Sequence, residues 1–187
     1  MPTNRRYFPA DSARWLALAV GMAGLVIALD VLSKALVTRE LGPNGSRSSI
    51  QIFGNVFELH YALNSGVAFG MLRGSSTLAG VLVGVVIVPL VIVLIVLAGR
   101  GPIWAVAAGL VLGGAAGNLI DRIGDQTVTD FISIGRWPSF NLADSAITVG
   151  AILLIGLSFR DRDRDEHLQP IDDQDTKKGW MVAPTAC

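Results

Sequence analysis

Four apolar stretches, each close to the length of a membrane-spanning helix, dominate the hydrophobic pattern of the chain. They run over residues 15–37, 78–98, 103–120 and 142–157. A helix needs about 20 apolar residues to cross the hydrocarbon core of a bilayer. The pattern therefore predicts an all-α membrane protein, with one four-span domain over residues 1–159 and a small β element described next.

Between the first two apolar stretches, the spacing of apolar residues changes from helical to alternating. Two short alternating runs lie within residues 48–70: Ile50 and Ile52 alternate with polar neighbours, and Phe57, Leu59 and Tyr61 alternate with their neighbours. Gly54-Asn55 is typical of a two-residue hairpin turn. We expect a small β-sheet on the outer membrane surface, followed by a surface loop whose glycines allow close backbone approach.

Composition and charge narrow the class of protein. Hydrophobic residues make up 51% of the chain and charged residues 16%, below the share of about a quarter that is usual in soluble domains. The formal net charge is zero, so we expect no nucleic-acid partner. The single cysteine, Cys187, excludes an internal disulfide and argues against a cysteine metal cluster or nucleophile. The polar residues 160–187 predict a disordered tail.

Charge also sets the expected topology. The first span follows Arg5, Arg6 and Arg14, and the helical pattern continues past the apolar run, so we expect an uncleaved span rather than a signal peptide. Four spans place both termini on one side. Arginines near the termini and Arg100 favour the cytoplasm for that side.

Two aspartates, Asp130 and Asp144, stand at the edge of the last span. An acid there costs a few kcal/mol unless it is paired, solvated or used. One interpretation of Asp144 is structural, because Asn141 and Asp144 have the spacing of a capping box at a helix start. The other is chemical. Two carboxylates can hydrolyse a carbonyl compound, with one taking a proton from water while its protonated partner polarises the carbonyl. The positive end of the helix dipole favours Asp144 as the anion.

Further polar residues are predicted at the same membrane face. Asp30, Ser33 and Lys34 share one face of the first span, and either form a self-contained ion pair or brace a site. Gly109, Gly113 and Gly117 form a small-residue row that allows close helix packing. We expect Asn118, Asp121 and Arg122 to cluster where this row meets the interface, with a helix-end salt bridge as the alternative. His60 is a weaker candidate for a general base.

Five segments carry a family resemblance. They are DVLSK (30–34), NSGVAFG (64–70), GGAAGNLIDR (113–122), VTDF (128–131) and WPSFNLADSAI (137–147). In this order they resemble lipoprotein signal peptidase, the signal peptidase II family. The resemblance implies a bacterial aspartyl endopeptidase that removes signal peptides from diacylglyceryl-modified prolipoproteins, cutting just before the lipidated cysteine.

The resemblance also assigns roles to residues. It implies that Asp130 and Asp144 form the catalytic dyad. The residues expected to bind substrate or support the site are Asp30, Lys34, Asn64, Gly66, Asn118, Asp121, Arg122 and Asn141. It implies no cofactor and no metal, a monomer in contact with membrane lipids, and a multi-pass protein of the bacterial inner membrane whose active site faces outward.

Two alternatives come from other classes of protein. A metal-dependent lipid phosphotransferase would use Asp121, Asp130 and Asp144 to hold magnesium. A proton-coupled transporter would use the acids as a relay through the span, but these acids cluster at one predicted interface instead of being spread across the membrane.

Overall fold

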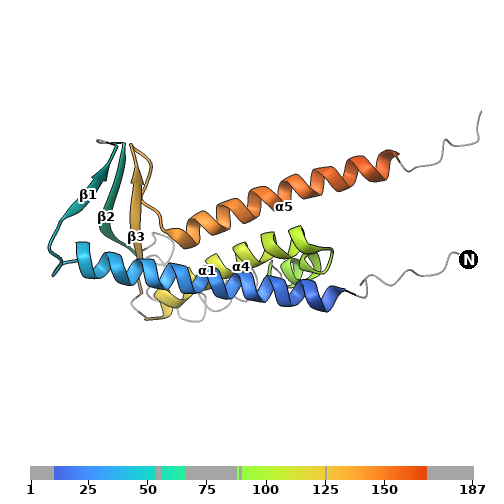
Figure 1. The fold of residues 1–187 in the computed structure, drawn as a ribbon, viewed down its shortest axis with the longest axis horizontal. Coiled ribbons are helices and arrows are strands. Elements are labelled where there is room, and N and C mark those ends of the chain that lie inside the picture. The colour runs from blue at the N-terminus through green and yellow to red at the C-terminus, as the bar shows by residue number, and fades with distance from the viewer. Residues whose placement is uncertain (1–10, 54–55, 66–87, 89, 125, 168–187) are drawn as a thin grey trace, which may run out of the picture. The chain divides into compact units, whose positions relative to one another are not determined.

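The structure is a computed structural model that describes residues 11–53, 56–65, 88, 90–124 and 126–167. Its labelled elements are α1 (Ser12–Leu41), β1 (Ser49–Ile52), β2 (Phe57–Asn64), α4 (Pro102–Gly124), β3 (Val128–Ile134) and α5 (Leu142–His167) (Figure 1). Within the described part, α1, α4 and α5 are long and apolar enough to cross a membrane. The predicted class, a helical membrane protein with a small sheet, is confirmed.

The boundaries differ from the predicted ones in two places. The helix α5 continues to His167, so the prediction of a disordered tail is wrong for residues 160–167. The predicted span 78–98 lies largely outside the described residues, although residues 90–98 are helical. The chain divides into two units, Met1–Leu154 and Ile155–Cys187, and the candidate site lies in the first.

The small-residue row of α4 brings this helix against α1. A Cβ atom added to Gly109 would lie 2.6 Å from the carbonyl oxygen of Ala19, and one added to Gly113 would lie 2.7 Å from that of Ala23. Only glycine permits backbones to approach so closely. The predicted packing role of the row is confirmed, and the row ends beside a site residue, since a Cβ on Gly117 would lie 2.8 Å from Oδ2 of Asp30.

The sheet is antiparallel, with the strands in the order β1-β2-β3. The predicted hairpin of the first two strands is present, with Ile52 opposite Phe57, while the turn at Gly54-Asn55 lies outside the described residues. The third strand was not predicted. It places Asp130 within the sheet.

A β-bulge in β2 determines which side chains meet Asp130. Leu59 lies opposite Ile132, whereas Ala62 lies opposite Asp130, so β2 has one more residue than β3 in this interval. An extra residue moves every later side chain to the other face of the sheet. Asn64 therefore shares a face with Asp130, which it would not do in an unbroken register.

Candidate active site

Asp130 is buried in the sheet and held by two amide groups. Its side chain is 3% exposed. The Nδ2 of Asn64 donates to Oδ2 of Asp130 at 2.9 Å, and the Nδ2 of Asn141 donates to Oδ1 at 2.8 Å. Burial raises the pKa of Asp130 above its usual range, and the nearby charge of Asp144 raises it further, while the two amides oppose the shift. The carboxyl group is thereby disposed to hold a proton.

Asp144 lies in the first turn of α5, in the capping box that the sequence predicts. The backbone N–H of Asp144 donates to Oδ1 of Asn141 at 2.9 Å, and the backbone N–H of Asn141 donates to Oδ2 of Asp144 at 3.2 Å. The other oxygen, Oδ1, accepts from Nδ2 of Asn118 at 2.7 Å. Both oxygens of this carboxylate therefore have hydrogen-bond donors.

Asn141 connects the two carboxyl groups. It is fully buried, and its Nδ2 donates to Asn118 as well as to Asp130, at 3.1 Å to Oδ1 of Asn118. The preceding residue, Phe140, exchanges backbone hydrogen bonds with Ile132 of β3, at 3.0 and 2.9 Å. This bridge turns the link between Asp130 and Asp144 back on itself, so that both aspartates reach the same amide.

A second pair of aspartates surrounds a lysine. The Nζ of Lys34 lies 2.6 Å from Oδ2 of Asp30 and 2.7 Å from Oδ2 of Asp121. The side chains of Lys34 and Asp30 are 6% and 0% exposed. We call these three residues the ionic cluster. Asp30 also accepts the backbone N–H of Ala143 through Oδ1 at 3.0 Å, so α1 caps the start of α5.

Asn118 joins the ionic cluster to the candidate dyad. Its Oδ1 lies 3.5 Å from Nζ of Lys34, while its Nδ2 donates to Asp144. Arg122, one turn later in α4, donates from Nη1 to the backbone oxygen of Asn118 at 3.1 Å. The predicted cluster of Asn118, Asp121 and Arg122 thus exists, but its acid pairs with Lys34 of α1.

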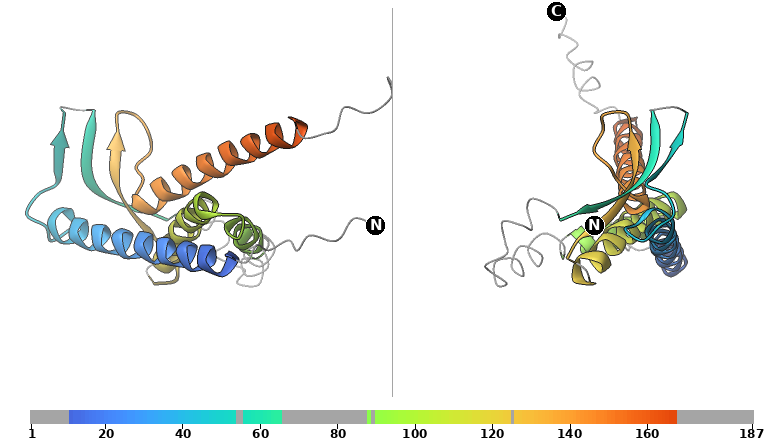
Figure 2. Two further views of the ribbon diagram at one scale, coloured as in Figure 1. Left: turned by 45° about the vertical axis from the view of Figure 1, so that its right-hand side comes forward. Right: turned by 90° about the vertical axis from the view of Figure 1, so that its left-hand side faces the viewer.

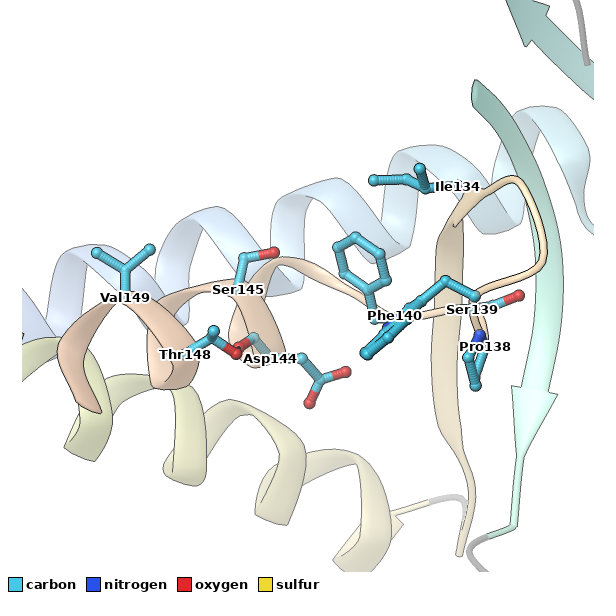
Figure 3. A pocket seen from close by; sticks show the side chains of 9 residues that line it. Ile134, Pro138, Ser139, Phe140, Asp144, Ser145, Thr148 and Val149 are labelled. Atoms are coloured by element: carbon cyan, nitrogen blue, oxygen red, sulfur yellow. The ribbon is translucent and has the colours of Figure 1, made fainter. Parts of the chain in front are cut away.

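A mostly apolar cavity of about 740 Å³ opens beside Asp144 (Figure 3). Its lining residues are Ile134, Trp137, Pro138, Ser139, Phe140, Asp144, Ser145, Thr148 and Val149. The first turns of α5 form one wall, and the segment between β3 and α5 forms the other. A water molecule or an apolar substrate group can reach Asp144 through this space.

Two predicted residues, Gly66 and His60, remain to be placed. Gly66 lies outside the described residues. His60 faces Ser139, with Nε2 3.1 Å from Oγ, and so braces the segment that precedes Asn141.

In the described part of the chain, no three acidic, histidine or cysteine side chains are grouped as metal ligands would be. Asp121 faces Lys34 rather than Asp130 and Asp144, the other two acids of the magnesium alternative.

Sequence reasoning missed two features that build the site. The first is β3, although the β-branched and aromatic residues of VTDFISI are typical of a strand. The second is the cap that Asp30 supplies to Ala143, which joins residues 113 positions apart. No local pattern in the sequence signals that second contact.

The chain is similar to known proteins over most of its length. Residues 22–160 match the family described as Signal peptidase (SPase) II. A lipoprotein signal peptidase of Rhodococcus jostii is 42% identical over 80% of this chain and 76% of its own. One of Syntrophomonas wolfei is 46% identical over 76% of this chain and 93% of its own.

Solved structures agree with this similarity. A bacterial membrane enzyme determined by the in meso method at 2.3 Å resolution superposes with a TM-score of 0.63 at 25% identity, covering 81% of this chain and 93% of its own. A second such structure, at 1.9 Å resolution, gives a TM-score of 0.62 at 26% identity. The sequence match extends over the larger part of α1, the sheet, α4 and most of the spanning part of α5. The chain therefore belongs to the signal peptidase II family of membrane proteases.

Proposed function

We propose that the protein is an aspartic endopeptidase that removes signal peptides from diacylglyceryl-modified prolipoproteins, cutting just before the lipidated cysteine. The names of its relatives support the substrate class. The observation that carries the chemistry is the position of Asn141, a buried amide that binds Asp130 through its side chain and Asp144 through its backbone and side chain. Such a bridge holds two carboxyl groups in one site.

The two aspartates would divide the acid and base roles. Asp144, at the helix start and facing the cavity, takes a proton from the attacking water. Asp130, whose pKa burial and Asp144 raise, holds the proton that polarises the scissile carbonyl. As the tetrahedral intermediate collapses, Asp144 returns its proton to the departing amine and Asp130 recovers its own. Close carboxyl groups share one proton readily, because both cannot ionise easily.

The bilayer would position the substrate. A diacylglyceryl group stays among the lipid chains, so the peptide bond beside it lies near the membrane interface. The apolar cavity next to Asp144 suits the lipid-linked residue or its neighbours. The extended peptide can add to an edge of the sheet.

The cellular arrangement follows from the expected topology. We propose a monomer in the bacterial inner membrane, with the site on the outer face and both termini, including the polar residues 160–187, in the cytoplasm. The donors that hold the two carboxyl groups, Asn64, Asn118 and Asn141, all come from one chain. A complete constellation within one chain supports a monomeric enzyme.

The experiment compares a precursor peptide that carries a diacylglyceryl cysteine with the same peptide lacking the lipid. The protein is reconstituted in nanodiscs, and the products are identified by mass spectrometry. We expect rapid cleavage of the lipidated peptide alone, with cysteine at the new amino terminus. Equal cleavage of both peptides would reject the lipidated substrate, and a cut elsewhere would reject the proposed position.

A further inference from the structure

One end of the sheet exposes large apolar side chains. We call Phe53, Val56, Ile134 and Trp137 the apolar tip; these residues are 87%, 62%, 45% and 71% exposed. They lie at the same end of the sheet, because Ile52, Phe57 and Ile134 are opposite one another across the strands. Figures 1 and 2 show the ends of β1 and β3 together at this end. Two segments there are joined, since the backbone N–H of Gly135 donates to the oxygen of Val56 at 2.8 Å. Grouped exposed apolar side chains indicate a binding surface.

The strand register gives the sheet next to the apolar tip one apolar face and one polar face. Ile52, Phe57 and Ile134 lie opposite one another across the three strands, and Ile50, Leu59 and Ile132 form the next row on the same face. The row between them, on the opposite face, is polar and consists of Gln51, Glu58 and Ser133. Side chains alternate between faces along a strand, so one face of this end is apolar and the other is polar.

The apolar face shares its surroundings with a membrane-spanning helix. Ile134 and Trp137 line the same cavity as Thr148 and Val149, and the latter two belong to the apolar window of α5. Figure 3 shows Ile134 and Val149 at opposite ends of this cavity. Because Thr148 and Val149 lie less than two turns into the spanning helix, the tip is placed near the boundary between headgroups and acyl chains.

The chemistry of the tip fits that boundary. Tryptophan is enriched at membrane interfaces, where its ring contacts acyl chains and its N–H remains hydrated. The neighbouring Arg136 is exposed and can place its guanidinium at lipid phosphates. From these observations we infer that the apolar tip is a lipid-binding surface, seated in the headgroup and acyl-chain boundary of the bilayer with the polar face of the sheet toward water.

This contact would set the height of the candidate dyad above the bilayer. Asp130 lies two residues before Ile132 on the same strand and face, so lipid contact at the tip fixes its depth. The inference rests on exposure, register and the shared cavity, and not on the peptidase chemistry. Loss of proteolysis would therefore leave it standing.

Tryptophan fluorescence tests the inference. Trp15, Trp104 and Trp180 are changed to Phe, which leaves Trp137 as the reporter. The protein is placed in nanodiscs of phosphatidylcholine and phosphatidylglycerol, with lipids brominated near the headgroup or near the chain end. We expect lipid brominated near the headgroup to quench Trp137 by about half, and more than lipid brominated near the chain end, as for a shallow interfacial side chain.

The matched control is a reporter on the opposite face of the sheet. Gln51→Trp in a background with all four native tryptophans changed to Phe is expected to respond to aqueous iodide and not to brominated lipid. Equal iodide quenching of Trp137 and of this reporter, without lipid quenching, would overturn the inference. So would quenching of Trp137 by a precursor peptide whose own lipid is brominated but not by brominated bilayer lipid, because the tip would then be a substrate surface.

A second measurement keeps all native tryptophans, in case their replacement prevents folding. A benzophenone amino acid is introduced at Phe53, and the irradiated protein is analysed for crosslinked phospholipid. We expect lipid adducts at Phe53 and none from the same group at Gln51. Equal yields at the two positions, or no adduct at Phe53, would contradict the placement of the apolar tip in the bilayer boundary.

Discussion

Asp30 and Asp121 share the cation of Lys34, whereas Asp130 and Asp144 are held by amide groups. Ion pairs and hydrogen bonds together connect all four acids. A cation at 2.6 or 2.7 Å binds each carboxylate to a fixed partner on another turn or another helix. Amides of asparagine orient a carboxyl group without carrying a charge. The contrast supports the proposal that the ionic cluster has a structural role and that the amide-held pair is the catalytic one.

The largest expected effect on stability comes from removing the shared cation. Lys34→Met leaves Asp30 and Asp121 without it, and breaking a buried pair in this way costs about 3–5 kcal/mol of unfolding free energy. Unfolding of purified protein in mixed micelles measures the loss. Asp121→Asn is the control, because Lys34 keeps Asp30 and because Asp121 is 18% exposed, so its cost is smaller. Equal stability of Lys34→Met and the wild type would contradict the architectural role.

The next prediction separates two roles of Asn141, which caps the first turn of α5 and bridges Asp130 and Asp144. Serine is a good N-cap residue, so Asn141→Ser retains a cap for the first turn of α5 but loses the bonds from Nδ2 to Asp130 and Asn118. We expect its kcat to fall by about 10²-fold while its stability stays close to that of the wild type. Asn141→Ala loses the cap as well and should also be less stable. Full kcat in Asn141→Ser would show that the bridge is dispensable.

A smaller effect tests the contact between the glycine row and the ionic cluster. In Gly117→Ala, the new Cβ would meet Oδ2 of Asp30 at 2.8 Å, and such overpacking costs about 1–3 kcal/mol. Gly21→Ala in α1 is the matched control, since a Cβ there meets nothing within 4 Å. Thermal unfolding in the same micelles compares them. A Gly117→Ala protein as stable as the Gly21→Ala protein would show that the contact between α4 and α1 tolerates the added volume.

The smallest effect is a change in pH dependence. The amide of Asn64 stabilises the ionised form of Asp130 and so lowers the pKa of that group. Asn64→Ala removes this bond and raises the pKa further. If protonated Asp130 is the active form, activity then persists to higher pH, and the basic limb of the kcat profile moves upward. A downward shift of this limb would reverse the assignment of the proton to Asp130.

Local signals in the sequence were sufficient for much of the fold. The apolar runs predicted α1, α4 and the start of α5, and the spacing of Asn141 and Asp144 predicted the capping box. The four-residue spacing of Asp30 and Lys34 indicated an ion pair as one of two interpretations, and the pair is present. Each of these features depends on neighbours within one helical turn, which a sequence displays directly.

Features that depend on distant contacts were harder to predict. A strand such as β3 is stabilised by its pairing with β2, more than 60 positions earlier in the chain, and strand preference is context-dependent. The bulge before Ala62 has no local signature, yet it decides whether Asn64 reaches Asp130. The ion pair between Lys34 of α1 and Asp121 of α4 likewise depends on how closely the glycine row lets the two helices approach.

The most direct test of the contrast between the two pairs is a single-turnover assay of four variants, Asp30→Asn, Asp121→Asn, Asp130→Asn and Asp144→Asn. Each is given a saturating lipidated precursor, and binding and thermal unfolding are measured in parallel. We predict that Asp130→Asn and Asp144→Asn bind the precursor and stay folded while their cleavage rate falls by about 10³-fold or more. Asp30→Asn and Asp121→Asn should lose stability and keep most of their rate. Wild-type cleavage by either Asp130→Asn or Asp144→Asn would contradict the proposed dyad.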